Sequence, residues 1–417
     1  MQNVYDVLRE RGFIEQVSDE DKVREILSKP ITCYIGFDPT ADSFHVGSLV
    51  PIMALIQIQR HGHRVIALLG GGTAMVGDPT DRTEMRQLVS REEIDSFARD
   101  LKSQLERFID FSEGKALMLN NADWLYPLNY IEFLRDIGRH FSVNRMLAAE
   151  TYRQRLETGL NFIEFNYMLL QSYDYLFLYR NYGCTLQMGG NDQWGNILAG
   201  ADLIRRVEGG EAEALTFPLL TTADGTKMGK TEKGAVWLDA GRTSPYDYYQ
   251  YWINTDDRDV EHFLSLFTLL PMDEVRRLSA KGGADLRVAK EVLAFEATRI
   301  NHGEEEAEKA RTASRALFSG EGVGDDSAVP TYEIERKRFE EGIPAFILFS
   351  ETGIVKTRGA ARRLITQGGA YVSGRRLESF DERITLDDLK DGFILLRAGK
   401  KKYLRVRPSG KGNSSSG

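Results

Sequence analysis

Cysteine is scarce in this chain: only Cys33 and Cys184 occur among its 417 residues. Two cysteines cannot form a disulfide framework or a four-cysteine zinc site, so we expect the protein in a reducing compartment. The N-terminus lacks the basic start and apolar core of a signal peptide, and the longest apolar stretches, such as residues 263–272, are far shorter than a membrane span. Together these absences predict a cytoplasmic protein that does not enter membranes.

Common catalytic motifs are also missing. The chain contains no Gly-x-Ser-x-Gly elbow and no His-Glu-x-x-His helix, which argues against the common hydrolase classes. His61 and His63 are separated by a single glycine, but no third ligand lies nearby in the sequence. We therefore expect a pair of loop histidines there and no metal site.

Charge is distributed unevenly along the chain. The formal net charge is −8, yet residues 341–417 contain fifteen Lys and Arg against eight Asp and Glu. A basic C-terminal part on an acidic body is typical of an enzyme that carries a module for binding a polyanion, whereas a merely solvated surface also gives some asymmetry. Charge alone leaves these two interpretations open.

Short apolar runs alternate with helical patterns over the first 220 residues. This alternation predicts an α/β fold with a Rossmann-like, doubly wound parallel sheet. From 244 to 317 the pattern is helical throughout, and a stretch rich in Gly, Asp and Ser follows it. The strands are expected at residues 31–37, 64–69, 116–119, 185–188 and 215–221.

We expect five parts in the chain. A Rossmann-like catalytic domain is followed by a loop and α-helical domain, a flexible linker, a compact basic α+β module and a disordered, low-complexity tail. Their expected limits, in that order, are 1–222, 223–318, 319–341, 342–407 and 408–417.

The segment from Gly36 to Ser48 joins the first expected strand to the first helix. In a parallel sheet this junction lies at the carboxyl edge, where ligands bind. Gly47 lets a ligand approach the backbone closely, and the helix start offers free N–H groups to an anion. A plain connecting loop with a hydrogen-bonded His45 is the alternative, and the residue types alone favour it.

A second segment, Gly225 to Thr231, nearly matches a phosphate-binding P-loop, but it is one residue too short between its glycines. Lys227 and Lys230 can still reach phosphates as point charges from a glycine-flanked loop. A solvated basic loop is the alternative interpretation.

The apolar stretch 162–182 predicts a buried helix, on which Tyr167, Gln171 and Asp174 form one polar stripe. Buried polar groups need partners, so the stripe indicates either an internal network or a polar pocket. We favour a pocket, because these three side chains together can hold an ammonium and a hydroxyl. The expected strand at 185–188 is followed by paired glycines and Asp192, which either accepts from a ribose hydroxyl or caps the next helix.

Taken together, these segments resemble the bacterial tyrosyl-tRNA synthetases, a family of class I aminoacyl-tRNA synthetases. The likeness extends over the chain to about residue 407. The run from Tyr34 to Ser43, followed by His45-Val46-Gly47-Ser48, is similar to the HIGH signature of the family, and Lys227-Met228-Gly229-Lys230-Thr231 is similar to its KMSKS signature. Ser48 stands where the family often has a second histidine.

The resemblance implies a role for each matching residue. Tyr34 and Asp174 would bind the phenolic hydroxyl of tyrosine, and the α-ammonium would be held by Asp78, Tyr167 and Gln171. The catalytic residues implied are His45, Thr40, Lys227, Lys230 and Thr231. The ATP-binding residues implied are Asp38, Gly47, Gly190, Asp192, Gln193 and Lys230. Arg82 and Arg86 are further, weaker candidates for a polyphosphate contact.

The same resemblance implies tyrosine–tRNA ligase activity. L-tyrosine would react with ATP to give tyrosyl-adenylate and pyrophosphate, and the tyrosyl group would then move to tRNA(Tyr). Mg²⁺ would accompany ATP, the C-terminal module would bind RNA, and the protein would be a homodimer. The alternatives are a tryptophanyl-tRNA synthetase, for which a Tyr34–Asp174 pair is poorly suited, a P-loop NTPase, and an accessory RNA-binding protein.

Overall fold

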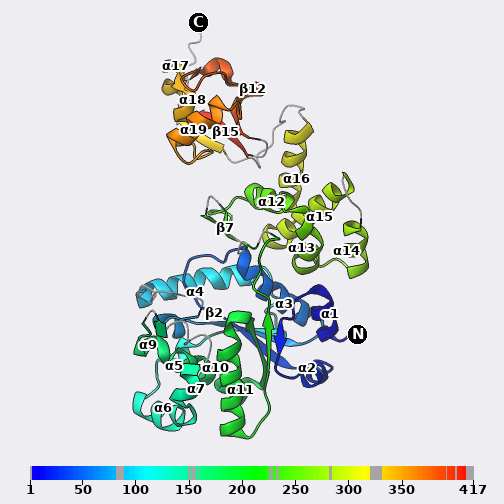
Figure 1. Cartoon of the computed structure of the whole chain (residues 1–417), viewed down its shortest axis with the longest axis vertical. Helices are drawn as coiled ribbons and strands as arrows, with labels where there is room; N and C mark the ends of the chain where they lie inside the picture. The colour runs from blue at the N-terminus through cyan, green and yellow to red at the C-terminus, as the bar shows by residue number, and fades with distance from the viewer. Residues whose placement is uncertain are drawn as a thin grey trace. The chain divides into compact units, whose positions relative to one another are not determined.

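The computed structural model describes residues 2–80, 89–148, 152, 156–157, 159–223, 225, 228, 230–231, 234–280, 284–319, 331–390, 392–399 and 402–409. The chain folds as two compact units. Figure 1 shows the chain coloured by residue number, from blue at the N-terminus to red at the C-terminus. The first contains residues up to 243 together with 251–303, and the second contains 244–250 together with the residues from 304 onward. The helical part expected at 223–318 is therefore divided between the two units.

A six-stranded sheet with the order β1-β6-β5-β2-β3-β4 is the centre of the first unit. Five strands are parallel, and the edge strand β1 runs antiparallel to β6. The predicted Rossmann-like parallel sheet is confirmed, while the antiparallel edge strand is absent from the prediction. The strands are β1 (Gln16–Val17), β2 (Thr32–Phe37), β3 (Arg64–Leu69), β4 (Ala116–Asn120), β5 (Cys184–Gly190) and β6 (Glu213–Phe217).

The last of these strands differs from the one expected at 215–221. β6 begins two residues earlier, at Glu213, and ends at Phe217. The next residue, Pro218, has no amide hydrogen to donate to a neighbouring strand, so the pairing stops there.

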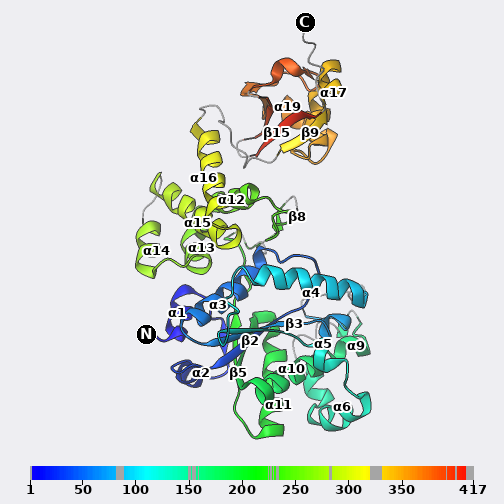
Figure 2. The same ribbon diagram turned by 180° about the vertical axis from the view of Figure 1, so that it is seen from behind.

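Helices cover both faces of the sheet, as the opposite views in Figures 1 and 2 show. The helices of this part, of which some cover the sheet and others pack further out, are α1 (Val4–Arg11), α2 (Glu20–Ile26), α3 (Leu49–Arg60), α4 (Arg91–Leu105), α5 (Ala122–Leu125), α6 (Tyr130–Asp136), α7 (Val143–Ala148), α9 (Phe162–Phe165), α10 (Tyr167–Tyr182) and α11 (Trp194–Glu208). Tyr34, Ile66 and Leu68 point to the face covered by α10 and α11, where they join one hydrophobic cluster. The helix α3 lies on the opposite face.

The buried helix expected at 162–182 is two helices. The short α9 ends at Phe165, and α10 begins at Tyr167. The first turn is not buried, because the side chain of Phe162 is 70% exposed. The helix α10 ends where Gly183 adopts a left-handed conformation with a φ of 63°, which is a common helix stop.

The remainder of the first unit is mainly helical. A two-stranded ribbon of β7 (Lys230–Thr231) and β8 (Gly234–Ala235) precedes α12 (Pro245–Ile253). This helix is divided between the units, because its residues up to 250 belong to the second unit and those from 251 to the first. The helices α13 (Val260–Phe267), α14 (Met272–Ser279) and α15 (Ala284–His302) follow. Arg11 of α1 is buried and donates to the carbonyl oxygens of Ser265 at 2.7 Å and Thr268 at 3.0 Å. This arginine therefore caps the C-terminal end of α13 and ties it to the Rossmann-like part.

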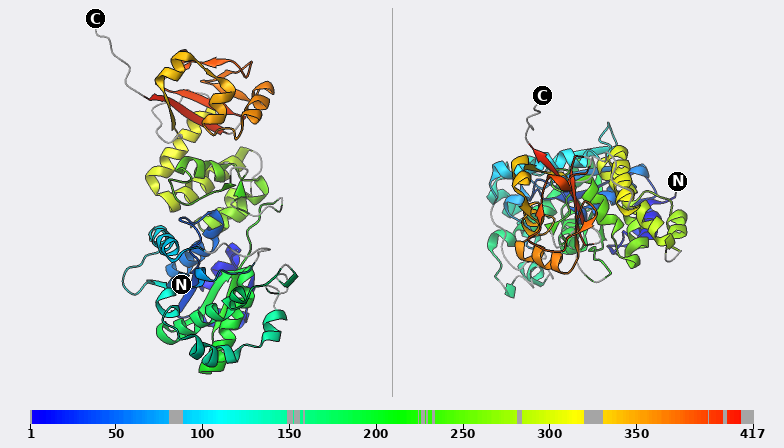
Figure 3. Two further views of the ribbon diagram at one scale, coloured as in Figure 1. Left: turned by 90° about the vertical axis from the view of Figure 1, so that its left-hand side faces the viewer. Right: turned by 90° about the horizontal axis from the view of Figure 1, so that it is seen from above.

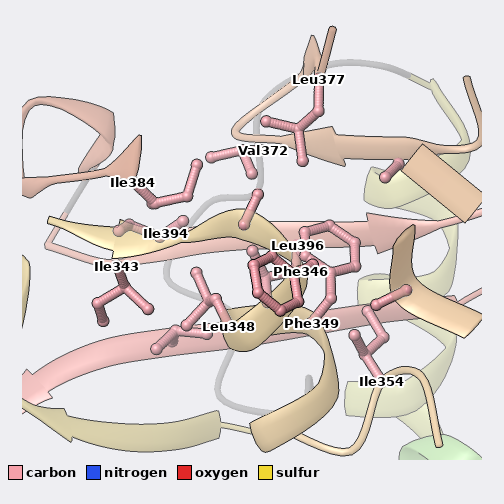
Figure 4. Close-up of a cluster of buried hydrophobic side chains, with 14 of the residues drawn as sticks. Ile343, Phe346, Leu348, Phe349, Ile354, Val372, Leu377, Ile384, Ile394 and Leu396 are labelled. Carbon is pink, nitrogen blue, oxygen red and sulfur yellow. The ribbon is translucent and has the colours of Figure 1, made fainter. Parts of the chain in front are cut away.

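The second unit contains α16 (Glu304–Ser319) and a C-terminal α+β module (Figure 3). The module has a five-stranded sheet with the order β12-β11-β14-β15-β9, in which only β9 and β15 pair in parallel. Figure 4 shows its core, where Phe346 and Phe349 pack with Ile394 and Leu396. Its elements are β9 (Thr331–Glu335), α17 (Arg336–Glu341), β10 (Ile343–Pro344), α18 (Ala345–Glu351), α19 (Arg358–Thr366), β11 (Ala370–Val372), β12 (Arg375–Arg376), β13 (Arg383–Ile384), β14 (Ile394–Ala398) and β15 (Lys402–Ser409).

Two expected limits of this module are wrong. The second half of the linker expected at 319–341 forms β9 and α17, so the module begins at Thr331 and not at 342. The tail expected from 408 wrongly includes Pro408 and Ser409, which belong to β15 and pair with β9. Residues 320–330 and 410–417 lie outside the described residues.

A search of the described helices for a membrane-spanning segment finds none that is both long and apolar enough.

Candidate active site

A cavity of about 320 Å³ opens at the carboxyl ends of β2, β3 and β5. This is the edge at which open parallel sheets bind their ligands. The structure places many of the sequence-predicted residues on the wall of this one cavity, although they come from segments far apart in the chain. These residues are Tyr34, Asp38, Gly47, Asp78, Tyr167, Gln171, Asp174, Gly190, Asp192 and Gln193.

Asp174 lies at the buried end of the cavity, where its side chain is 2% exposed. One carboxylate oxygen accepts a hydrogen bond from Asn121 Nδ2 at 2.9 Å, and the other accepts from Trp124 Nε1 at 2.7 Å. Burial raises the pKa of Asp174 to about 7, although these two hydrogen bonds favour the ionised form and oppose the rise. The carboxyl group therefore titrates near neutral pH in the free protein.

Tyr34 ends in the same part of the cavity and is 1% exposed. Its hydroxyl has no hydrogen-bond partner among the described residues. Burial and the neighbouring Asp174 raise the pKa of this hydroxyl well above its usual value, so it stays protonated and can donate. A buried hydroxyl without a partner is costly, which indicates that a ligand hydroxyl belongs here.

Hydrogen-bond acceptors gather elsewhere on the wall. Gln171 presents a buried amide oxygen that has no partner in the described part of the chain. Asp78 accepts from the backbone N–H of Thr80 at 3.0 Å and its hydroxyl at 2.6 Å, and also from Gln193 Nε2 at 2.6 Å. Tyr167 donates to the second acid, Asp38, at 3.0 Å. Among the described lining residues there is no Lys or Arg, so this wall is suited to a cation such as an ammonium.

Two glycines make room for the acids on the rest of the wall. A Cβ atom on Gly190 would lie 2.3 Å from the Asp192 carboxylate, and one on Gly70 would lie 2.0 Å from that of Asp38. Side chains at these positions would collide with the two acids, so glycine is needed there for the carboxylates to lie where they do. This is the part of the cavity that matches the expected nucleotide side.

His45 and Thr40 are predicted site residues that do not line the cavity. His45 is exposed, and its Nδ1 accepts from the backbone N–H of Gly47 at 3.0 Å at the start of α3. A Cβ atom on Gly47 would lie 3.7 Å from the carbonyl oxygen of Met228, so the two signature segments meet at this point. His45 thus stands beside the cavity rather than on its wall.

Several predicted residues lie outside what the structure describes. Lys227, Arg82 and Arg86 are among the undescribed residues, and for Lys230 and Thr231 only the backbone, in β7, is described. Their expected contacts with phosphates stay predictions.

The sequence patterns do not reveal the residues that support Asp174 and Asp38. Asn121 Nδ2 donates to Asp174 and also lies 3.0 Å from Thr73 Oγ1, and Thr73 in turn donates to Asp38 at 2.8 Å. Asn121 follows β4 directly and thus lies at the carboxyl edge, which is the one signal that points to it. Trp124 lies one turn further on and carries no such signal.

Comparison with known proteins agrees with this geometry. The family model described as tRNA synthetases class I (W and Y) matches residues 27–319. This match covers more than half of the chain, so the protein with this Rossmann-like sheet and cavity is a class I aminoacyl-tRNA synthetase. A second model, described as the tyrosine–tRNA ligase SYY-like C-terminal domain, matches residues 324–406.

Relatives of similar length identify the amino acid. The tyrosine–tRNA ligase of Syntrophus aciditrophicus is 57% identical over 98% of this chain and 99% of its own. That of Caldanaerobacter subterraneus subsp. tengcongensis is 56% identical, with 97% and 99% covered. A C-terminally truncated mitochondrial tyrosyl-tRNA synthetase of Aspergillus nidulans has a similar structure, with a TM-score of 0.70 and 32% identity over 76% of this chain and 95% of that one. The chain belongs to the tyrosyl-tRNA synthetases, and its activity is that of a tyrosine–tRNA ligase (EC 6.1.1.1), which uses ATP.

Proposed function

We propose that the cavity binds L-tyrosine with its phenol at the Tyr34–Asp174 end and its ammonium at the acceptors of Gln171, Asp78 and Tyr167. The observation that carries this proposal is the buried hydroxyl of Tyr34, which has no hydrogen-bond partner in the described part of the chain and lies beside the buried carboxylate of Asp174. A phenolic hydroxyl supplies one donor and one acceptor, so it can donate a hydrogen bond to Asp174 and accept one from the hydroxyl of Tyr34. An indole offers a donor only and would leave the Tyr34 hydroxyl without an acceptor.

The reaction then needs no covalent bond to the enzyme. The tyrosine carboxylate attacks the α-phosphate of ATP, forming tyrosyl-adenylate and releasing pyrophosphate, and a ribose hydroxyl of tRNA(Tyr) next takes the tyrosyl group. Catalysis consists of positioning and of stabilising the charge that develops on the phosphates. ATP would lie against Asp38, Gly47, Gly190, Asp192 and Gln193, and the catalytic contacts would come from His45, Thr40, Lys227, Lys230 and Thr231.

Magnesium is expected to arrive on the ATP phosphates. Mg²⁺ usually keeps several waters and binds through substrate phosphates with only one or two carboxylates from the protein. Bound there, the ion would neutralise phosphate charge while the residues of this chain position the reacting groups. We place the enzyme in the cytoplasm, where its two free, buried cysteines are compatible with reducing conditions.

The experiment that tests this assignment is ATP–pyrophosphate exchange with each standard amino acid in turn. Tyrosine alone should support exchange. Exchange with tryptophan would show that the cavity binds an indole and not a phenol. ATP hydrolysis without an amino acid would favour a simple NTPase.

A homodimer is the proposed assembly, and exposed apolar side chains support it. Seven of the ten large hydrophobic residues that are exposed in the described part of the chain fall between residues 126 and 163. Such a concentration is typical of an interaction surface. The residues are Tyr126, Tyr130, Ile131, Val143, Leu156, Phe162 and Ile163.

Replacing Phe162 by glutamate should convert the dimer to monomers. Phe162 is 70% exposed, so the change alters little inside the folded chain but would bury a charge in the interface. Size-exclusion chromatography with light scattering measures the mass directly. The matched control is Val288→Glu on α15, which is 54% exposed and should stay dimeric. A Phe162→Glu protein that is still dimeric, or a monomeric wild type, would contradict the proposal.

The C-terminal module is the proposed tRNA-binding part, with α19 as its main basic element. Arg358, Arg362 and Arg363 of this helix are all exposed, and the guanidinium of Arg362 also packs over the ring of Phe346 at 4.1 Å. Exposed arginines on one helix bind nucleic-acid phosphates, and their affinity falls steeply with salt.

The double variant Arg358→Ala, Arg363→Ala should raise the KM for tRNA about tenfold and lower the salt dependence of tRNA binding by roughly two phosphate contacts. Pyrophosphate exchange should not change, because neither residue lines the cavity. The control is Arg336→Ala, Lys337→Ala on α17, where both side chains form ion pairs with glutamates one turn away. Unchanged aminoacylation by the α19 variant would refute this role of the helix.

A further inference from the structure

Residues 236–242, here called the strap, run beside the first signature loop. The backbone N–H of Val46 donates to the carbonyl oxygen of Val236 at 2.9 Å, and that of Leu238 donates to Phe44 at 2.8 Å. These two bonds make an isolated antiparallel bridge in which His45 lies opposite Trp237. The strap is thus an additional strand-like partner for the loop that carries His45.

The backbones of the strap and of the loop also accept hydrogen bonds from, or donate them to, side chains of neighbouring helices. Asn301 of α15, which is buried, donates to the carbonyl oxygen of Leu238 at 3.1 Å. On the loop, Gln104 of α4 donates to the carbonyl oxygen of Asp42 at 3.1 Å and accepts from the N–H of Phe44 at 3.1 Å. The backbone of the strap and that of the loop are therefore each held by a side chain from a neighbouring helix.

Arg242 joins the strap to the loop through its side chain. Its guanidinium carbon lies 3.4 Å from the centre of the Trp237 ring, and it forms an ion pair with Asp42 on the loop. The ring of His45 meets the same indole edge to face, with 6.2 Å between ring centres. Trp237 therefore contacts the imidazole directly and is itself held in place by Arg242.

Neither Trp237 nor Arg242 lines the cavity. A cation over an indole is among the stronger side-chain contacts at a surface, and the added ion pair restrains the guanidinium. Any effect of these two residues on the reaction would therefore act through His45.

We propose that Trp237 and Arg242 are positioning residues that fix the imidazole of His45 for adenylate formation. The inference rests on the proposed function, since it takes His45 to act on ATP in the activation step. A catalytic group must be held within a fraction of an ångström of its productive place, so loosening its support lowers the rate of the chemical step more than substrate affinity.

The test measures tyrosyl-adenylate formation by rapid quench in the full chain, together with the dissociation constants of tyrosine and ATP. Arg242→Ala should lower the adenylation rate constant about fivefold to tenfold and change either dissociation constant by less than about twofold. Arg242→Lys keeps a cation over the ring and should restore most of the rate. The matched control is Arg91→Ala, because Arg91 also stacks on an aromatic ring, Tyr126 at 4.3 Å, and also pairs with an acid, Asp95. It should react at the wild-type rate.

A double variant separates the inference from the proposed function. If Arg242 acts through His45, Arg242→Ala should have little further effect in a His45→Ala background. A full, additive loss in that background would overturn the positioning role, as would a wild-type rate for Arg242→Ala alone. A wild-type rate for His45→Ala would instead overturn the proposed role of His45 itself.

Discussion

Replacement of Asp174 by asparagine is expected to lower kcat/KM for tyrosine activation by about 10²- to 10⁴-fold. In the structure both oxygens of the carboxylate accept hydrogen bonds, from Asn121 and from Trp124. Rotating the Asn121 amide to present its oxygen to position 174 would break another hydrogen bond, because that oxygen accepts from the backbone N–H of Gly72 at 2.7 Å. An amide nitrogen at position 174 would therefore face a donor, and the phenol would lose its anionic acceptor.

Pyrophosphate exchange at saturating ATP and varied tyrosine measures this effect. The control is Asp273→Asn on α14, which removes an exposed carboxylate that does not line the cavity. It should behave like the wild type. An Asp174→Asn enzyme within about threefold of the wild type would show that the carboxylate does not read the phenol.

The same carboxylate should make tyrosine binding and stability depend on pH. Its pKa in the fold is about 7, above the usual value of 3.8, so protonation favours the folded state of the free protein. That contribution is complete below about pH 4 and is lost as pH rises to about 7, whereas Asp174→Asn has no such titration. Relative to wild type, the variant should gain on the order of 4 kcal/mol of stability over this range. Melting temperatures of both proteins from pH 5 to 8 measure this trend.

The affinity of the wild type for tyrosine should increase from pH 6 to 8, because Asp174 becomes ionised over this range and the ionised carboxylate is the better acceptor for the phenol.

Phenylalanine is expected to support exchange with a kcat/KM at least about 10⁴-fold below that of tyrosine. Without a ligand hydroxyl, the hydroxyl of Tyr34 and the charge of Asp174 would both be buried without the partner they need. A site that binds a substrate hydroxyl discriminates by this factor against an analogue that lacks the hydroxyl. The tyrosyl-tRNA synthetases are the standard example of this effect, and the magnitude is theirs. Exchange kinetics with both amino acids, purified free of tyrosine, measure the ratio.

The sequence predicted most of the main sheet because buried parallel strands are continuous apolar runs between turn residues. The strands at 32–37 and 64–69 have this pattern and were predicted within one residue. The strand β1 contains only Gln16 and Val17, too short for any apolar pattern to appear. The strand β9 was assigned to a linker, because it follows a Gly- and Ser-rich stretch and its pairing partner, β15, lies about seventy residues later.

The site was predicted as far as local periodicity extends. Tyr167, Gln171 and Asp174 share one face of a helix, and in the structure all three line the cavity, while their roles stay predictions. Asn121 and Trp124 could not be found in this way, because only the tertiary fold brings the end of β4 to Asp174. The strap is the same kind of case, since Arg242 and Asp42 are 200 residues apart.

The central claim is that Tyr34 and Asp174 read the phenol, and one ratio tests it most directly. The measurement is kcat/KM for tyrosine divided by kcat/KM for phenylalanine, in wild type and in Tyr34→Phe, by pyrophosphate exchange. The wild type should strongly prefer tyrosine, and Tyr34→Phe should lose part of that preference. The kcat/KM for tyrosine should decrease while that for phenylalanine does not, because one of the two contacts to the ligand hydroxyl is gone. An unchanged ratio in Tyr34→Phe, or a wild type that prefers tryptophan, would show that the phenol is bound elsewhere.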